Sequence, residues 1–190
     1  MERIEGWLAR RRLHRQIRAA PMLAFAEVTE GDVVRITGRV ATLDKQTLEA
    51  PFSGKPCVYY SVTTVFVGGA RPQVLASHHN AVPFLLANGD HRAVIDLTHA
   101  QLSVTIRHRT KTSATHFLAG RTLSGYLERR EAVIAAHDAL VLVGTGIAEP
   151  DPERPPSELY RGLTAHRFRF VGAAEDPLLV SDEPALFSTE

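Results

Sequence analysis

Cysteine is almost absent from this chain, because Cys57 is the single thiol among 190 residues. One cysteine excludes an internal disulfide, and it excludes a RING or any other zinc module that needs several closely spaced thiolates. Long apolar runs are also missing, and the longest, Ala139–Val143 and Val82–Ala87, have the length of a strand. A membrane-spanning helix needs roughly 20 apolar residues, so the sequence predicts none.

Net charge is also small, because 22 basic side chains are balanced by 21 acidic ones. The whole chain therefore lacks the strong field that attracts nucleic acid or an anionic membrane. The charge is unevenly distributed, since residues 1–20 are rich in arginine and residues 173–190 contain five acids and no base. The arginine-rich start lacks the apolar core of a signal peptide. We expect a cytoplasmic protein, with peripheral contact to a membrane surface as an alternative.

Residues 2–19 are expected to form a helix that ends at Pro21, because they contain good helix formers and no proline. Apolar residues recur among the arginines at near-helical spacing. We favour a surface helix that packs Trp7 and Leu8 on the body of the protein. The alternative is a basic amphipathic helix that contacts anionic lipid or a partner protein. The residues that would make this contact are Arg10, Arg11, Arg12, Arg15 and Arg18.

Short β-type segments separated by glycine and proline turns fill most of the remaining sequence. The expected strands are Val33–Leu43, Thr47–Ala50, Val58–Val67, Gln73–Ser77, Val82–Leu86, Arg92–Leu97, Leu102–Arg107, Ala139–Gly144, His166–Val171 and Leu178–Val180. Asn88-Gly89-Asp90 predicts a hairpin turn, and Gly38 predicts a bulge or a bend at a barrel corner. Gly144-Thr145-Gly146 is interpreted as a turn, and Pro150–Pro156 as a loop.

Ser124–Ala136 is expected to form one internal helix, because Tyr126, Leu127, Arg130, Val133 and Ile134 lie near helical spacing. There is no regular alternation of strands and helices, which disfavours a doubly wound fold. The pattern predicts a mainly β protein, a small barrel or sandwich with an N-terminal helix and one internal helix. We expect a helix over residues 1–20, a barrel domain over 21–184 and a tail over 185–190.

Several blocks resemble one known family. The most specific is Leu48, Pro51 and Pro56-Cys57-Val58, which is similar to that family's signature of a leucine, a proline and Pro-Cys-Val. The other similar blocks are Arg18–Pro21 with Glu30–Gly38, Val82–Leu86 with Asn88–Asp90 and Ala93–Asp96, Tyr126–Ile134 with Ala139–Gly144, and Asp176–Asp182. Together they resemble the GIDE/BAM domain, the non-RING domain of MULAN-type ubiquitin ligases, which also occurs in many prokaryotic proteins.

The resemblance implies an OB-like β-barrel that binds or scaffolds rather than catalyses. It implies a protein partner or a small ligand, and peripheral membrane contact as a further alternative. The chain has no RING, so the resemblance implies no ligase activity of its own. A role as a component of a ubiquitin-like, stress or defence system is another alternative that it leaves open.

No catalytic set, metal site or cofactor motif is predicted. A nucleophilic cysteine needs a nearby base, so we interpret Cys57 as a buried core thiol, with a hydrolase or thiol enzyme as the alternative. The nine histidines show no metal-binding spacing, and adjacent His78 and His79 would point to opposite faces of a strand. We expect them to be exposed or hydrogen-bonded.

A second basic cluster occurs at Arg107, Arg109 and Lys111. A solvated loop or strand end is the simpler interpretation. The functional alternative is a weak contact to phosphate or single-stranded nucleic acid, since OB-type barrels bind strands in basic grooves.

Overall fold

The computed structural model describes residues 2–68, 71–118, 121–152 and 166–188, and these form two compact units. Unit 1 consists of Met1–Gln46, Pro83–Val104 and Ala136–Glu190, and unit 2 of Thr47–Val82 and Thr105–Ala135. Residues 21–184, expected as one domain, therefore contribute to both units.

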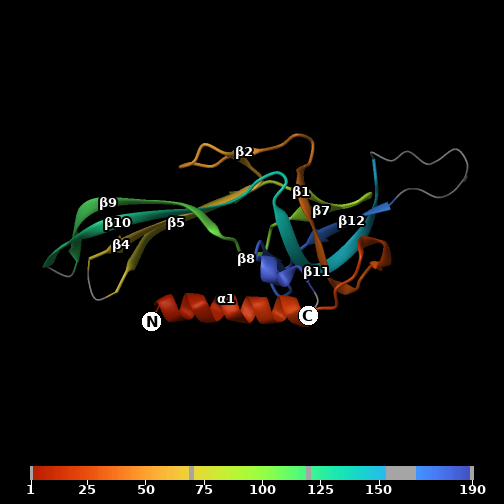
Figure 1. The fold of residues 1–190 in the computed structure, drawn as a ribbon, viewed down its shortest axis with the longest axis horizontal. Coiled ribbons are helices and arrows are strands. Elements are labelled where there is room, and N and C mark those ends of the chain that lie inside the picture. Colours follow the sequence, from red (N-terminus) through yellow and green to blue (C-terminus); the bar gives the residue numbers. More distant parts are fainter. Residues whose placement is uncertain (1, 69–70, 119–120, 153–165, 189–190) are drawn as a thin grey trace, which may run out of the picture. The chain divides into compact units, whose positions relative to one another are not determined.

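The described residues of unit 1 form one α-helix, seven strands and two 3-10 helices (Figure 1). These elements are α1 (Glu2–Ala19), η1 (Phe25–Glu27), β1 (Val33–Thr42), β6 (Phe84–Asn88), β7 (His91–Asp96), β8 (Ala100–Ser103), β11 (Ala139–Pro150), β12 (His166–Val171), β13 (Leu178–Ser181) and η2 (Pro184–Leu186). The expected N-terminal helix is thus confirmed. Residues 153–156 of the expected proline-rich loop lie outside the described residues.

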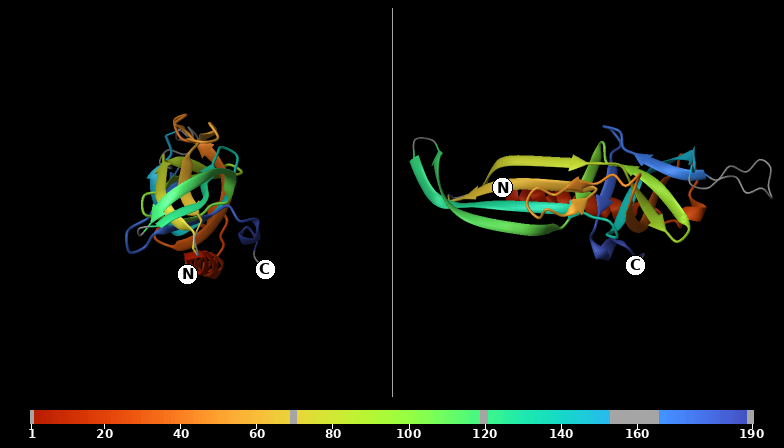
Figure 2. Two further views of the ribbon diagram at one scale, coloured as in Figure 1. Left: turned by 90° about the vertical axis from the view of Figure 1, so that its left-hand side faces the viewer. Right: turned by 90° about the horizontal axis from the view of Figure 1, so that it is seen from above.

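Five strands of unit 1 close into a small β-barrel in the order β1-β6-β7-β12-β11 and back to β1 (Figure 2). Strands β7 and β12 are parallel, and the other pairs around the barrel are antiparallel. β13 pairs with β11 outside this ring, and β8 continues the sheet beside β13. The expectation of a mainly β chain built on a small barrel is confirmed.

Alternate residues of the barrel strands point inward and form an apolar core. Ile36 lies opposite Leu142, Val40 opposite Leu86, and Phe84 opposite Ile95. All six side chains are at most 1 % exposed. Burying one such side chain contributes about 1.5–3 kcal/mol relative to leaving it in water, so this layer stabilises unit 1 strongly.

Two glycines make close approaches in the barrel. Gly38 precedes Arg39, the residue of β1 that pairs with both β11 and β6. A Cβ atom at Gly38 would lie 2.7 Å from the carbonyl oxygen of Ala87, which explains a glycine at this barrel corner. A Cβ atom at Gly144 would clash with Leu178. The interpretation of residues 144–146 as a turn is wrong, because they lie within β11 and give space to neighbouring side chains.

α1 packs on the outside of the barrel through a narrow apolar stripe. Leu13 and Ile17 are 6 % and 0 % exposed, and they form a cluster with Val141, Val143 and Leu186. The helix therefore lies on the surface of unit 1 as expected, but the side chains that pack there are Leu13 and Ile17. Leu8 is 51 % exposed and does not pack as predicted, while the side chain of Trp7 lies outside the described residues. No helix in the described part of the chain is long and apolar enough to span a bilayer.

Strands are the only regular elements in the described residues of unit 2. Its elements are β2 (Leu48–Glu49), β3 (Pro56–Cys57), β4 (Tyr59–Val67), β5 (Gln73–Ala81), β9 (Ile106–Leu118) and β10 (Arg121–Ile134). The last four form an antiparallel sheet in the order β5-β4-β10-β9, and β2 pairs with β3. One hairpin of this sheet is inserted between β1 and β6, and the other between β8 and β11.

The prediction of an internal helix over Ser124–Ala136 is wrong, because these residues form most of β10. Val133 of β10 pairs with Tyr60 of β4, and Lys111 of β9 pairs with Glu128. Apolar and charged residues alternate only partly along this strand, which produced an apparent helical period. Pairing on both sides overrides the local helix preference, since a strand between two neighbours satisfies its backbone groups in the sheet.

Candidate functional site

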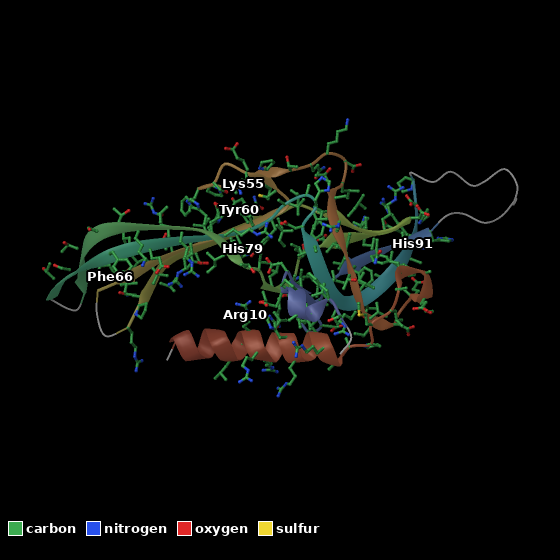
Figure 3. The ribbon with its side chains drawn as sticks, viewed as in Figure 1. Arg10, Lys55, Tyr60, Phe66, His79 and His91 are labelled. Atoms are coloured by element: carbon green, nitrogen blue, oxygen red, sulfur yellow. The ribbon has the colours of Figure 1, made fainter. Side chains whose placement is uncertain are left out.

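The first candidate surface is the outer side of α1. Arg11, Arg12, Arg15 and Arg18 are exposed there, at spacings of three and four residues that bring helical side chains together. The structure thus gathers four of the five predicted arginines. Arg10 has a different role, because its guanidinium forms an ion pair with Glu183, next to η2 (Figure 3).

Two further polar contacts join α1 to the rest of unit 1. Arg18 donates a 3.5 Å hydrogen bond to the carbonyl of Ala185, and His14 Nε2 lies 3.1 Å from the hydroxyl of Ser103. Burial lowers the pKa of His14, the positive charge of Arg10 lowers it further, and Glu183 opposes the shift. Sequence reasoning missed His14, whose position one turn from Arg10 and Arg18 was the available signal.

The second predicted cluster lies on the edge strand β9 of unit 2 rather than on the barrel. Arg107, Arg109 and Lys111 are all exposed. Arg107 falls at a bulge, because Glu131 pairs with His108 and the next residue, Ala132, pairs with Ile106. Arg107 also makes a further interaction in the structure. An OB-type basic groove along barrel strands is therefore not formed by these three residues.

A buried carboxylate reduces the positive charge around Arg109 and Lys111. The side chain of Glu128 is 8 % exposed and lies 3.9 Å from Arg109 Nη1. Arg130 donates a 3.0 Å hydrogen bond to Glu128, which lowers the pKa of the glutamate, while burial opposes this shift. Lys111 Nζ lies 5.0 Å from the centroid of the Tyr126 ring, in a cation–π contact. These partners leave less charge for a phosphate than the sequence suggested.

The Pro51–Cys57 block forms a turn that encloses an internal anion. Glu131 is fully buried and accepts hydrogen bonds from the backbone N–H groups of Phe52, at 2.8 Å, and Ser53, at 3.1 Å. Consecutive backbone N–H groups of a turn form a nest that binds anions. Here a side chain of the same unit occupies the nest, so the most distinctive segment of the sequence has a structural explanation.

Cys57 lies in β3 and is 1 % exposed. Its Sγ atom lies 3.6 Å from the carbonyl oxygen of Leu48, within a cluster that includes Ala50, Tyr60 and Val133. Burial raises the pKa of the thiol to about 11, with a further contribution from the charge of Glu131. The interpretation of Cys57 as a buried core residue is confirmed. A thiolate is the reactive form of cysteine, and it is scarce at neutral pH in this environment.

The adjacent histidines point to opposite faces of β5, as expected. His78 is paired with Val62 and His79 with Ser61. His78 Nε2 lies 3.1 Å from the hydroxyl of Tyr60. Tyr60 lies in β4 and His79 in the neighbouring strand β5 (Figure 3). In the described part of the chain, no group of three or more His, Cys, Asp or Glu side chains has an arrangement that could hold a metal ion.

One end of the barrel carries a small hollow with titratable groups. Arg92 Nε lies 3.4 Å from Asp151, whose side chain is 2 % exposed. The hollow has a volume of about 50 Å³ and is lined in part by His91, His166 and Phe168. Organic ligands occupy pockets of about 300–1,000 Å³, so this hollow is too small for them.

Comparison with known proteins does not extend these observations. Neither a protein-family model nor any curated protein or solved structure matches the chain.

Proposed function

We propose that this chain is a non-enzymatic binding module that uses the outer face of α1 to contact an acidic surface of a protein partner. One observation carries the proposal. The apolar stripe of α1, Leu13 and Ile17, is buried on the barrel while Arg11, Arg12 and Arg15 are exposed. A helix held in this way presents its positive charges without a cost for ordering the backbone at the moment of binding.

A protein partner fits this surface better than insertion into a bilayer. An interfacial helix binds lipid by burying an apolar face among the acyl chains. On α1 that face already packs on Val141, Val143 and Leu186, and from residue 8 to residue 19, where the side chains are described, Leu8 is the only large apolar one that is exposed. Among the described side chains, membrane contact would therefore depend mainly on the arginines, which makes it an outcome that the experiment must distinguish.

The barrel type is part of the same proposal. If β1, β6, β7, β11 and β12 are numbered 1 to 5 in chain order, their order around the barrel is 1-2-3-5-4-1. Strands 3 and 5 of this numbering are the parallel pair. This is the strand order of OB folds, which act widely as binding modules. The order supports an OB-type domain, and the sequence blocks around Pro51–Cys57 support a distant relation to the GIDE/BAM family.

The test is site-specific photo-crosslinking in cells that express the chain. A photoreactive amino acid at Gln16, an exposed position of α1, captures whatever contacts the helix. We expect a discrete protein product that disappears when Arg11, Arg12 and Arg15 are replaced by glutamate. The matched control replaces three other exposed basic residues, Lys45, Lys55 and Arg71, by glutamate, and it should retain the product.

A lipid product would assign the basic face to membranes and contradict the proposal. The same product from both charge-reversed proteins would also contradict it, because the contact would then not depend on the arginines of α1. Arg10 is left unchanged in these variants, since its ion pair with Glu183 helps to hold the helix.

A further inference from the structure

The four-stranded sheet of unit 2 has two edges of different character. β5 forms one edge and β9 the other, while β4 and β10 have neighbours on both sides. An edge strand has N–H and C=O groups on its open side that can pair with another chain. Natural proteins commonly protect such edges with charged side chains.

Only one of these edges carries Lys, Arg, Asp or Glu side chains, and it carries them in its first half. β9 carries Arg107, Arg109 and Lys111, all exposed, and a second positively charged strand would be repelled there. β5 has the sequence QVLASHHNA and contains no Lys, Arg, Asp or Glu. Its Val74 and Leu75 side chains are 45 % and 41 % exposed.

The open side of β5 can be assigned from the register of the sheet. Val82 donates its N–H to Val58, so even-numbered residues of β5 direct their backbone groups toward β4. Odd-numbered residues direct theirs away. The outward N–H of Ala81 is bonded to its neighbour Asn80 at 2.9 Å, which leaves Ser77 and His79 as the centre of the open edge. A bulge at Leu75 ends the regular part of the strand.

We propose that β5 is a self-association surface, where it pairs antiparallel with β5 of a second copy of this chain. The neutral strand brings no like formal charges together in any antiparallel register, so it is compatible with itself. Pairing of identical edges about a two-fold axis is closed and stops at the dimer. Pairing of β5 with β9 of another copy would instead leave open edges and continue into larger assemblies.

The dimer should dissociate on dilution. Contact between two strands of nine residues is small beside a standard interface of roughly 1,600 Å². The experiment is sedimentation velocity on the full chain over a roughly hundredfold range of concentration, a range that spans about 2.7 kcal/mol of association free energy. We expect the population to move from monomer to dimer.

Two variants localise the contact. Ser77→Lys places like charges directly or diagonally opposite across the new pair, and should leave the protein monomeric throughout the range. The matched control is Ser113→Lys, the same substitution at an exposed position of the β9 edge, which should dimerise as the unmodified chain does. Circular dichroism establishes that both variants fold.

If Ser77→Lys fails to fold, His79→Pro replaces it, because proline at this position removes only an outward N–H and spares the ladder to β4. A monomer at every concentration overturns the proposal. So does a dimer that survives both Ser77→Lys and His79→Pro, or an assembly that grows beyond the dimer with concentration.

Discussion

Glu131 in β10 accepts the backbone N–H of Phe52 at 2.8 Å, although 79 residues separate the two in the chain. We predict that Glu131→Ala destabilises the protein by about 2–4 kcal/mol, because it leaves the N–H groups of Phe52 and Ser53 without an acceptor. Glu131→Gln keeps one acceptor oxygen and should lose less. Urea unfolding measures both effects, and the control is Glu49→Ala, a substitution at the exposed residue of β2. Equal stability of Glu131→Ala and the unmodified chain would refute the role assigned to this carboxylate.

The barrel interior should not tolerate a methyl group at Gly144. The added Cβ would clash with Leu178, and overpacking a core of this kind costs about 1–3 kcal/mol. We therefore expect Gly144→Ala to lower the melting temperature, whereas Thr145→Ala, the next residue of β11, should have a smaller effect. Combining Gly144→Ala with Leu178→Ala should cost less than the sum of the single changes. Simple additivity would show that the two positions do not meet.

Acid should weaken the ion pairs on the outer face of β11. Burial opposes ionisation of Glu149, but hydrogen bonds from Arg169 at 2.8 Å and Arg167 at 2.6 Å outweigh it and lower the pKa. A carboxylate with a lowered folded-state pKa stabilises the protein above its unfolded-state pKa, and this contribution is lost as pH falls through the folded value.

The stability difference between the unmodified chain and Glu149→Gln should accordingly be largest near neutral pH and shrink below about pH 4. Urea unfolding across this range measures the difference. Glu30→Gln, an exposed glutamate outside the ion pairs, controls for the loss of one negative charge. A difference that is constant with pH would contradict the assignment.

The thiol of Cys57 should react slowly in the folded protein. Its pKa is raised to about 11, so the thiolate fraction at pH 8 is about two orders of magnitude below that of an ordinary cysteine near 8.5. Labelling with a chromogenic disulfide reagent should be correspondingly slow and become fast in denaturant. Rapid labelling of the native protein would mean that the thiol is accessible and ionised.

Local patterns predicted the elements whose residues carry their own signal. The hairpin turn at Asn88-Gly89-Asp90 joins β6 to β7, and Gly89 has the positive φ of 59° that such turns need. The strand beginning at Val33 and the helix ending at Ala19 were likewise predictable from apolar spacing and from Pro21. Each depends on residues that are neighbours in the sequence.

Features fixed by distant partners were not predictable. β10 looked helical partly because one of its two strand partners, β4 with Tyr60, lies far away in the sequence. The glycines of β11 resembled a turn because the side chain that needs the space, Leu178, comes over 30 residues later. The ion pair between Arg109 and Glu128 was also hidden, since cross-strand pairing brings the two residues together.

The two hairpins of unit 2 also depend on one another. β4 and β10 pair along nine consecutive positions, although one hairpin precedes β6 and the other follows β8. Shortening either insertion to a tight turn would remove half of the sheet and strip the remaining central strand of a neighbour. The two insertions therefore form one structural unit, whereas the five strands of the barrel close on one another without a strand from either insertion.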